Sequence, residues 1–300
     1  MIINTVTPPE LKPSYLAGLD GLRALAVALV VIFHFFPTIL PFGYLGVDIF
    51  FVLSGFLVGN IIIKDIGKPN FFINFYSARI KRIFPPLILL ILINIIIGFF
   101  IFDSHQIRML REEIYYSSLF IKNFFIGNLR GYFGDNTNEF PLLHLWSLAI
   151  EEQFYIIMPL IMFWVSKNKK LMINTLVIIS SISLLSMCIG QLLFQQETFF
   201  NSFFRFWELS TGVFLAAKQD KIKDVMKQLN AKTFNYFIIV ILSFLTLTNV
   251  YFEVGNVFQN IFIVIFTFLI IGNCLEEKNK FFVIDQKPLV FLGKISYSLY

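Results

Sequence analysis

The sequence has few charged residues for its length. Asp, Glu, Lys and Arg together make up 14% of its 300 residues, whereas about 25% is usual in soluble domains. Hydrophobic residues make up 57%, and the mean hydropathy is +0.76. This balance excludes a soluble globular protein and predicts an all-α, polytopic bundle of transmembrane helices. The net charge of +5 does not indicate nucleic-acid binding, because the basic residues flank apolar runs.

Cysteine and histidine are also scarce. Cys188 and Cys274 are the two cysteines, and both lie in apolar runs without the spacing of a disulfide or a metal site. We therefore interpret them as packing residues. The three histidines are His34, His105 and His144, too few and too far apart to favour a metal site. We find no internal repeat, which weakens the prediction of an inverted-repeat transporter.

Long hydrophobic runs dominate the chain, and about 20 apolar residues cross a hydrocarbon layer of roughly 30 Å. The first run starts near Leu22 and lacks a small-residue cleavage site, so it predicts a retained span and not a signal peptide. A ninth run opens near Leu289 and is incomplete at Tyr300, and segment 114–126 favours a short or re-entrant helix. We place eight spans at about 22–40, 44–63, 84–102, 144–165, 171–193, 203–217, 234–252 and 258–275.

Lys and Arg are distributed unevenly between alternate loops. With the N-terminus in the cytoplasm, most of them fall on the cytoplasmic side, as the positive-inside rule requires. The far side would then hold only Arg108, Arg111, Lys122, Arg130 and Arg205. We expect a multi-pass protein of the bacterial plasma membrane with a cytoplasmic leader over 1–14. Residues 15–300 would form one membrane domain, truncated at its C-terminus.

Glu151 and Glu152 lie inside an apolar run. Each ionised carboxylate at the centre of a span costs roughly 2.5–3.5 kcal/mol, so a protein interior or a wet cavity must receive them. On a helix, His144 and Glu151 are almost two turns apart, and Glu151 and Tyr155 are one turn apart. With Ser147 they predict a polar stripe.

Only one of these two carboxylates can follow that stripe, because Glu152 lies about 100° round the helix. We expect one to face a cavity and the other to pair with a neighbour, for which Arg205 or an arginine elsewhere in the bundle is a candidate. A buried ion network without a catalytic role is the alternative.

Arg23 and His34 share one face of the first span, about 16 Å apart. Imidazole suits proton transfer near neutral pH, so His34 is a candidate catalytic residue. The alternative is that Arg23 reaches lipid phosphates and His34 makes a hydrogen bond within the bundle.

Arg79 and Arg82 lie three residues apart in what we expect to be a loop, just before Pro85 and Pro86. Two guanidinium groups at this spacing can grip a phosphate in forked geometry. An ordinary positive-inside anchor is the alternative.

Asp48 opens the second span, and we expect it to orient His34 across the short hairpin. Ser54 and Gly55 in the same span are interpreted as packing residues, because small residues let helices approach closely. Arg205 and Glu208 carry opposite charges at i, i+3. That pair is interpreted as structural or as lining an outer mouth.

Five motifs resemble the acyltransferase 3 family of integral-membrane O-acyltransferases, many of which acetylate surface polysaccharides. The resemblance runs in order from about residue 15 to the end, and it implies about ten spans. The motifs are Leu19-Asp20-Gly21-Leu22-Arg23-Ala24 with His34, Gly46-Val47-Asp48 through Ser54-Gly55-Phe56, Arg79-x-x-Arg82, Trp146 through Tyr155, and Leu292-Gly293-Lys294-Ile295-Ser296-Tyr297-Ser298.

The resemblance implies an acyl donor, acetyl-CoA, and no permanently bound cofactor. Arg79, Arg82 and Arg23 would hold the donor's phosphates on the cytoplasmic side. His34 would act as a general base or an acyl relay. Glu151 or Glu152 would polarise that histidine or bind the acceptor.

The acceptor would be a carbohydrate or glycolipid of the cell envelope, in contact with a set of polar residues near the outer face. In this interpretation Asp48 supports catalysis, and the membrane lipid is the other partner. The residues expected to contact the acceptor are His144, Ser147, Tyr155, Arg205 and Glu208.

Two other functions stay open at this point. One is a proton-coupled transporter or flippase of envelope precursors, in which His34, Glu151 and Glu152 form a proton relay. The other is a catalytically inactive membrane scaffold. The paired arginines favour the enzyme, because a proton-coupled carrier needs no phosphate grip. The acceptor's identity, the acyl length and the oligomeric state are not specified by the sequence.

Overall fold

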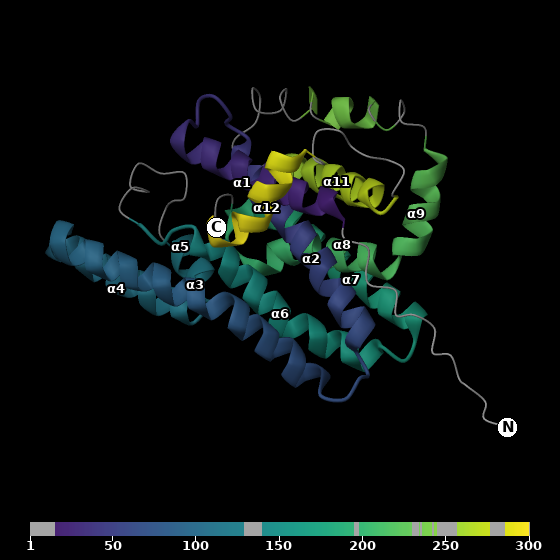
Figure 1. Ribbon diagram of the computed structural model, residues 1–300, viewed down its shortest axis with the longest axis horizontal. Coiled ribbons are helices and arrows are strands. Elements are labelled where there is room, and N and C mark those ends of the chain that lie inside the picture. The colour runs from purple at the N-terminus through teal and green to yellow at the C-terminus, as the bar shows by residue number, and fades with distance from the viewer. Residues whose placement is uncertain are drawn as a thin grey trace.

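The computed structural model describes residues 16–128, 140–194, 198–229, 234, 236–241, 243–244, 257–276 and 286–299. Within these ranges the chain is helical and contains no strand, as the composition predicts (Figure 1). The helices are α1 (Ala17–Phe35), α2 (Gly46–Asp65), α3 (Phe71–Ile101), α4 (Ser104–Ser118), α5 (Lys122–Asn128), α6 (Leu145–Val165), α7 (Lys169–Phe194), α8 (Ser202–Ala217), α9 (Gln219–Gln228), α11 (Val257–Cys274) and α12 (Lys287–Leu299), with a 3₁₀ turn at Gly43–Leu45.

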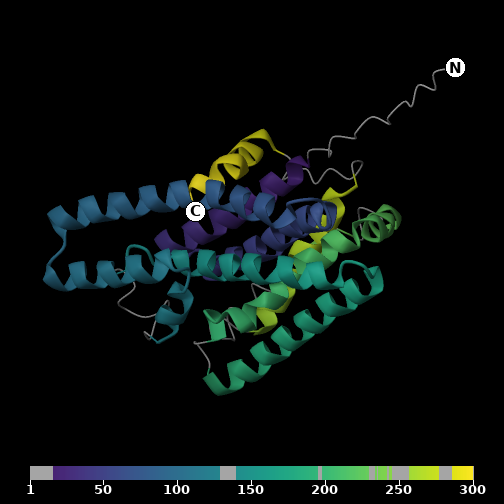
Figure 2. The same ribbon diagram turned by 90° about the horizontal axis from the view of Figure 1, so that it is seen from below.

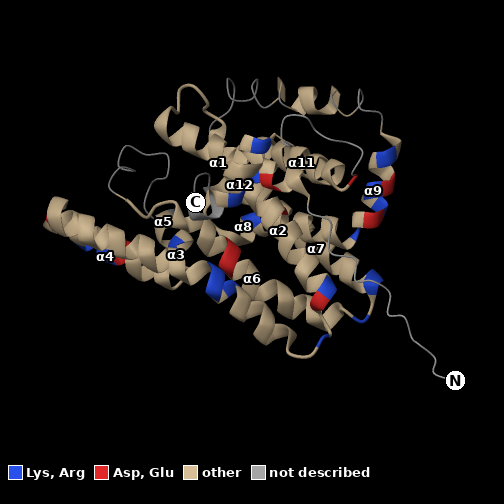
Figure 3. Ribbon diagram, viewed as in Figure 1, with Lys and Arg blue, Asp and Glu red and all other residues tan. Residues whose placement is uncertain are grey.

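Six helices among the described residues are long and apolar enough to cross a membrane. They are Ala17–Phe35, Gly43–Asp65, Phe71–Ile101, Leu145–Val165, Lys169–Leu193 and Val257–Cys274. The span expected at 203–217 is α8, whose 16 residues fall short of the usual 20. Most of the run 234–252 lies outside the described residues. Charged residues gather on α9 (Figure 3).

Helix α2 lies at the centre of the bundle and touches α8 backbone to backbone. A Cβ on Gly55 would come 2.0 Å from the carbonyl oxygen of Leu209, and a Cβ on Gly212 would come 2.1 Å from that of Val52. Any larger residue would push these helices apart, since real Cβ atoms do not approach so closely. Gly55 is thus a packing residue, as expected.

Helix α3 is longer than expected, because it starts at Phe71 and not near residue 84. Arg79 and Arg82 therefore lie on a helix, and the expectation of a loop there is wrong. Pro85 and Pro86 lie inside α3, which is tolerated because neighbouring groups in membrane bundles can satisfy the freed carbonyls. The ends of α3 and α4 project together past the other helices (Figure 2).

The short helix expected over 114–126 is two helices, α4 and α5. Asp103 starts α4 with a capping box, accepting from the backbone N–H of Gln106 at 2.8 Å while the Gln106 side chain accepts in return. Phe120 lies between the two helices, and its positive φ of 53° interrupts the helical conformation. A left-handed backbone is unusual for an aromatic residue, and it turns α5 back toward α6.

Candidate functional site

A cavity of about 280 Å³ lies between α1, α2, α3 and the start of α6. Apolar side chains of α2 and α3 form much of its wall, and polar groups from all four helices reach it. The polar residues that line it are Arg23, Ser54, Arg79, Arg82, His144, Glu151 and Tyr155. The sequence singles out six of these seven as catalytic or binding residues, and they converge here from segments far apart in the chain.

Glu151 is held from two sides. Its Oε1 accepts a hydrogen bond of 2.8 Å from the Ser54 hydroxyl on α2, and its Oε2 accepts one of 3.1 Å from the Tyr155 hydroxyl one turn along α6. Both bonds fix the carboxylate at the cavity wall. Ser54, expected to be a packing residue, is thus a polar residue of the site that sequence reasoning missed.

Glu152 lies away from the cavity, and its Oε1 is buried without a hydrogen-bond partner among the described residues. The expectation that one carboxylate faces a cavity agrees with the position of Glu151. The expected pairing of the other with Arg205 is wrong, because Arg205 pairs with Asp48 and Glu208.

Arg79 lies nearly buried between aromatic rings. Its guanidinium carbon is 4.9 Å from the ring centroid of Tyr155 and 5.4 Å from that of Phe75, distances that suit cation–π attraction. Arg82, one turn on, is exposed and lines the same cavity.

The arginine pair also borders a second hollow of about 470 Å³, beside the turn between α2 and α3. Asp65, Lys68 and Asn74 line it as well. Arg79 and Arg82 thus line both the first cavity and this second hollow. A long molecule with an anionic end could have that end bound by the pair and extend into the inner cavity.

Arg23 adds a third guanidinium group to the cavity. Its NH1 lies 2.9 Å from Asp20 Oδ1, on the same helix. Three arginines face the single carboxylate of Glu151 here, so the lining is electropositive and favours an anionic ligand.

His144 and the Arg79–Tyr155 contact mark opposite ends of the cavity along α6. Eleven residues separate His144 from Tyr155, which corresponds to about 16 Å on a helix. His144 precedes the span that starts at Leu145. Burial is the largest cause that lowers the pKa of His144, and together with the charges of Lys122 and His34 it brings that pKa to about 4. At neutral pH this imidazole is therefore uncharged.

His34 is exposed in the last turn of α1 and is not among the cavity-lining residues. Its Nδ1 donates to the Val30 carbonyl oxygen over 2.8 Å, which leaves Nε2 as the nitrogen with a lone pair. Its charge is the smallest of the three causes that lower the pKa of His144. Ser147 is buried and donates to the His144 carbonyl at 3.0 Å, so it supports the turn and does not line the cavity.

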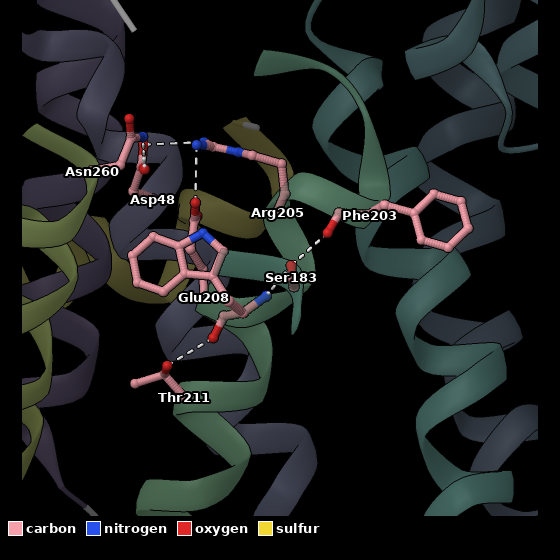
Figure 4. A network of polar contacts seen from close by, with 8 residues as sticks. Asp48, Ser183, Phe203, Arg205, Glu208, Thr211 and Asn260 are labelled. Atoms are coloured by element: carbon pink, nitrogen blue, oxygen red, sulfur yellow. Dashed lines mark hydrogen bonds and ion pairs between the residues drawn. The ribbon is translucent and has the colours of Figure 1, made fainter. Parts of the chain in front are cut away.

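A separate ion network fills the centre of the bundle (Figure 4). Arg205 on α8 lies 3.2 Å from Asp48 and 2.9 Å from Glu208, and all three side chains are fully buried. Asn260 on α11 donates to Asp48. The predicted i, i+3 pair of Arg205 and Glu208 is present, but it lies in the buried core and does not line an outer opening. The expectation that Asp48 orients His34 is not met, because its carboxylate contacts Arg205 and Asn260 instead.

Among the described residues, no group of His, Cys, Asp or Glu side chains could hold a metal ion.

Comparisons with known proteins point to one family. A family model described as an acyltransferase domain matches residues 16–300. The O-acetyltransferase OatA of Staphylococcus aureus strain NCTC 8325 / PS 47 is 34% identical over 311 residues, which covers 96% of this chain and 50% of the relative. The OatA of strain MRSA252 gives the same figures. The chain thus spans about half the length of the curated relatives it matches, and no solved structure matches it.

Proposed function

Because this chain belongs to the acyltransferase 3 family, we propose that it transfers an acetyl group from acetyl-CoA to a hydroxyl of a cell-envelope carbohydrate. That it is a membrane acyltransferase follows from the family match and from its helices. The donor, the acceptor and the roles of the residues are the proposal. The observation that carries it is the arginine pair, Arg79 and Arg82, which lines both the cavity and the second hollow.

The donor end of the site is the arginine pair. The phosphates of acetyl-CoA bind to Arg79 and Arg82 at the second hollow, where guanidinium groups can form forked hydrogen bonds. The pantetheine arm then enters the inner cavity past Arg23. The apolar wall of α2 and α3 suits that uncharged arm.

The transfer takes place at the His144 end. Nε2 of His34 takes the proton of the acceptor hydroxyl, whose oxygen attacks the thioester carbonyl carbon. The carbon–sulfur bond breaks and CoA leaves as the thiolate, which takes up a proton. Glu151, fixed by Ser54 and Tyr155, and the uncharged His144 bind the acceptor.

The proposed topology puts the N-terminus in the cytoplasm of a bacterium. The turn between α2 and α3, and with it the second hollow, then faces the cytoplasm where acyl-CoA is made. The basic residues of that turn agree with the positive-inside rule. The relatives' name, O-acetyltransferase, favours acetyl over a longer chain.

We would measure CoA-thiol release from acetyl-CoA by the protein in lipid nanodiscs, together with acetyl-CoA binding. Arg79→Ala/Arg82→Ala should abolish binding. Arg108→Ala/Arg111→Ala is the matched control, because that pair has the same spacing on α4 and is exposed. His34→Ala should keep binding and lose release. The enzyme proposal would be wrong if the wild-type chain neither bound nor consumed acetyl-CoA. Transport of an envelope precursor coupled to protons would then identify the protein as a transporter.

A further inference from the structure

Glu113 on α4 and Lys122 at the start of α5 form an ion pair with both side chains fully buried. Neither residue lines the cavity or enters the proposed chemistry. Burial lowers the pKa of Lys122 to about 8 although Glu113 raises it, and burial raises the pKa of Glu113. A buried pair of this kind is weak evidence for stability, because desolvation offsets the attraction. Its presence calls for another role.

The pair reaches the segment that carries His144. The second carboxylate oxygen of Glu113 accepts from the backbone N–H of Leu142 at 3.4 Å. Leu142 opens the turn that leads into α6, since its carbonyl oxygen accepts from Leu145 N–H at 3.0 Å. His144 is the N-cap residue of α6, and its side chain does not bond the helix end. Glu113 thus holds the backbone two residues before His144, whose imidazole lies at the end of the cavity.

The chain on both sides of Lys122 is held by a set of amide contacts to Phe120 and Asn123. The Gln153 side chain on α6 donates to the Phe120 carbonyl at 2.6 Å and to Asn123 at 2.9 Å. Asn123 in turn donates to Ser202 at 2.9 Å, at the start of α8. The left-handed Phe120 between α4 and α5 is a strained position, and such strain persists only where the surroundings over-determine it.

We propose that the Glu113–Lys122 pair is a positioning device that holds the turn of His144 at the acceptor end of the cavity. The inference rests on the proposed acyl transfer for its catalytic meaning. Lys122 and His34 are the charged or titratable neighbours that act on His144. Glu113 joins Lys122 to the backbone N–H of Leu142, two residues before His144. The pair acts through His144 and makes no contact with the donor site, so its loss should affect transfer and spare donor binding.

The test variant is Glu113→Gln/Lys122→Met, which removes both charges and leaves no lone buried ion. Three quantities are measured in nanodiscs: acetyl-CoA affinity, CoA release with a soluble chitooligosaccharide as acceptor probe, and labelling of His144 by diethyl pyrocarbonate at pH 7. A displaced catalytic group can cost up to about a hundredfold in rate. We expect release to fall at least about tenfold, with donor affinity within about twofold. His144 should be labelled several-fold faster.

The labelling reports on the position of His144, because burial and not the charge of Lys122 is the largest cause of its lowered pKa. Lys122→Arg keeps a cation that can pair with Glu113 and should restore much of the transfer. Asp224→Asn/Lys227→Met is the matched control, because it removes both charges of an exposed ion pair on α9. This control should leave all three quantities unchanged.

Two results would overturn the inference. One is a double variant whose rate of transfer and rate of His144 labelling equal those of the wild type. The other is an equal loss of transfer and donor affinity that follows a loss of folded protein, which would make the pair structural only. If the wild-type chain itself ignores acetyl-CoA, the proposed function fails. The His144 labelling still decides whether the pair positions that residue.

Discussion

The Ser54 hydroxyl on α2 bonds the Glu151 carboxylate on α6 over 2.8 Å, across 97 positions of sequence. This bond joins the central helix of the bundle to the helix that carries the cavity's carboxylate. With the Tyr155 hydroxyl on the other oxygen, it sets the direction in which Glu151 faces.

We predict that Ser54→Ala lowers CoA release in a protein that still folds. A hydrogen bond to a charged group contributes about 1.5–3 kcal/mol, so a loss of roughly tenfold to a hundredfold is expected if the bond acts in the transition state. Steady-state kinetics and a thermal melt measure the two quantities. Ser166→Ala is the control, because Ser166 is bonded to a backbone carbonyl outside the cavity. Unchanged kinetics in Ser54→Ala would show that Tyr155 alone orients the carboxylate.

The two adjacent glutamates should behave differently. Glu151→Gln should reduce turnover by about a hundredfold or more, as is typical for the loss of an acid–base or binding group. Glu152→Gln should keep most of the activity, because its Oε1 faces no cavity and has no partner among the described residues. Parallel kinetics of these two isosteric variants provide the comparison. Equal losses would contradict the assignment of Glu151 as the site's carboxylate.

Arg205→Met should destabilise the protein strongly. It leaves Asp48 and Glu208 buried without their cation, and breaking a buried pair costs about 3–5 kcal/mol. Lys68→Met breaks the exposed pair with Asp65 and should cost at most about 1 kcal/mol. Denaturant titration in detergent micelles measures both. A small effect of Arg205→Met would mean that water or a neighbouring group replaces the guanidinium.

Gly212→Ala should weaken the contact between α2 and α8. The added methyl would meet backbone atoms at 2.1 Å and 2.5 Å, and overpacking typically costs about 1–3 kcal/mol. Gly272→Ala is the control, because its nearest neighbours are side-chain atoms of Ile222 and Met226 at 3.1 Å, which can move. Melting temperatures compare the two. A stable Gly212→Ala protein would show that these helices can separate without loss.

The periodicity of one helix predicts which of its side chains share a face, and this explains what the sequence could reveal of the site. His144, Ser147, Glu151 and Tyr155 were expected on one stripe, and all of them except Ser147 line the cavity. Periodicity does not say which helix lies opposite. The bonds from Ser54 to Glu151 and from Asp48 to Arg205 join distant segments, so they were missed or misassigned.

The boundaries of α3 show a second limit of sequence reasoning. Hydropathy registers only the apolar part of a helix, whereas the backbone bonds of α3 continue through the polar residues from Phe71 onward. Pro85 and Pro86 agree with an apparent start near residue 84, because proline is tolerated in the first turn of a helix. The family motifs, by contrast, predicted the convergence of Arg23 with Arg79 and Arg82, which periodicity alone could not supply.

The length of α3 also shows where its arginines lie relative to the two membrane surfaces. From Ile101 back to Arg82 is 19 residues, or about 29 Å on a helix, close to the thickness of the hydrocarbon layer. With the Ile101 end at one membrane surface, Arg82 lies at the other. In the proposed reaction, the phosphates of the donor would thus stay at the membrane surface, and only its uncharged arm would extend inward to His144.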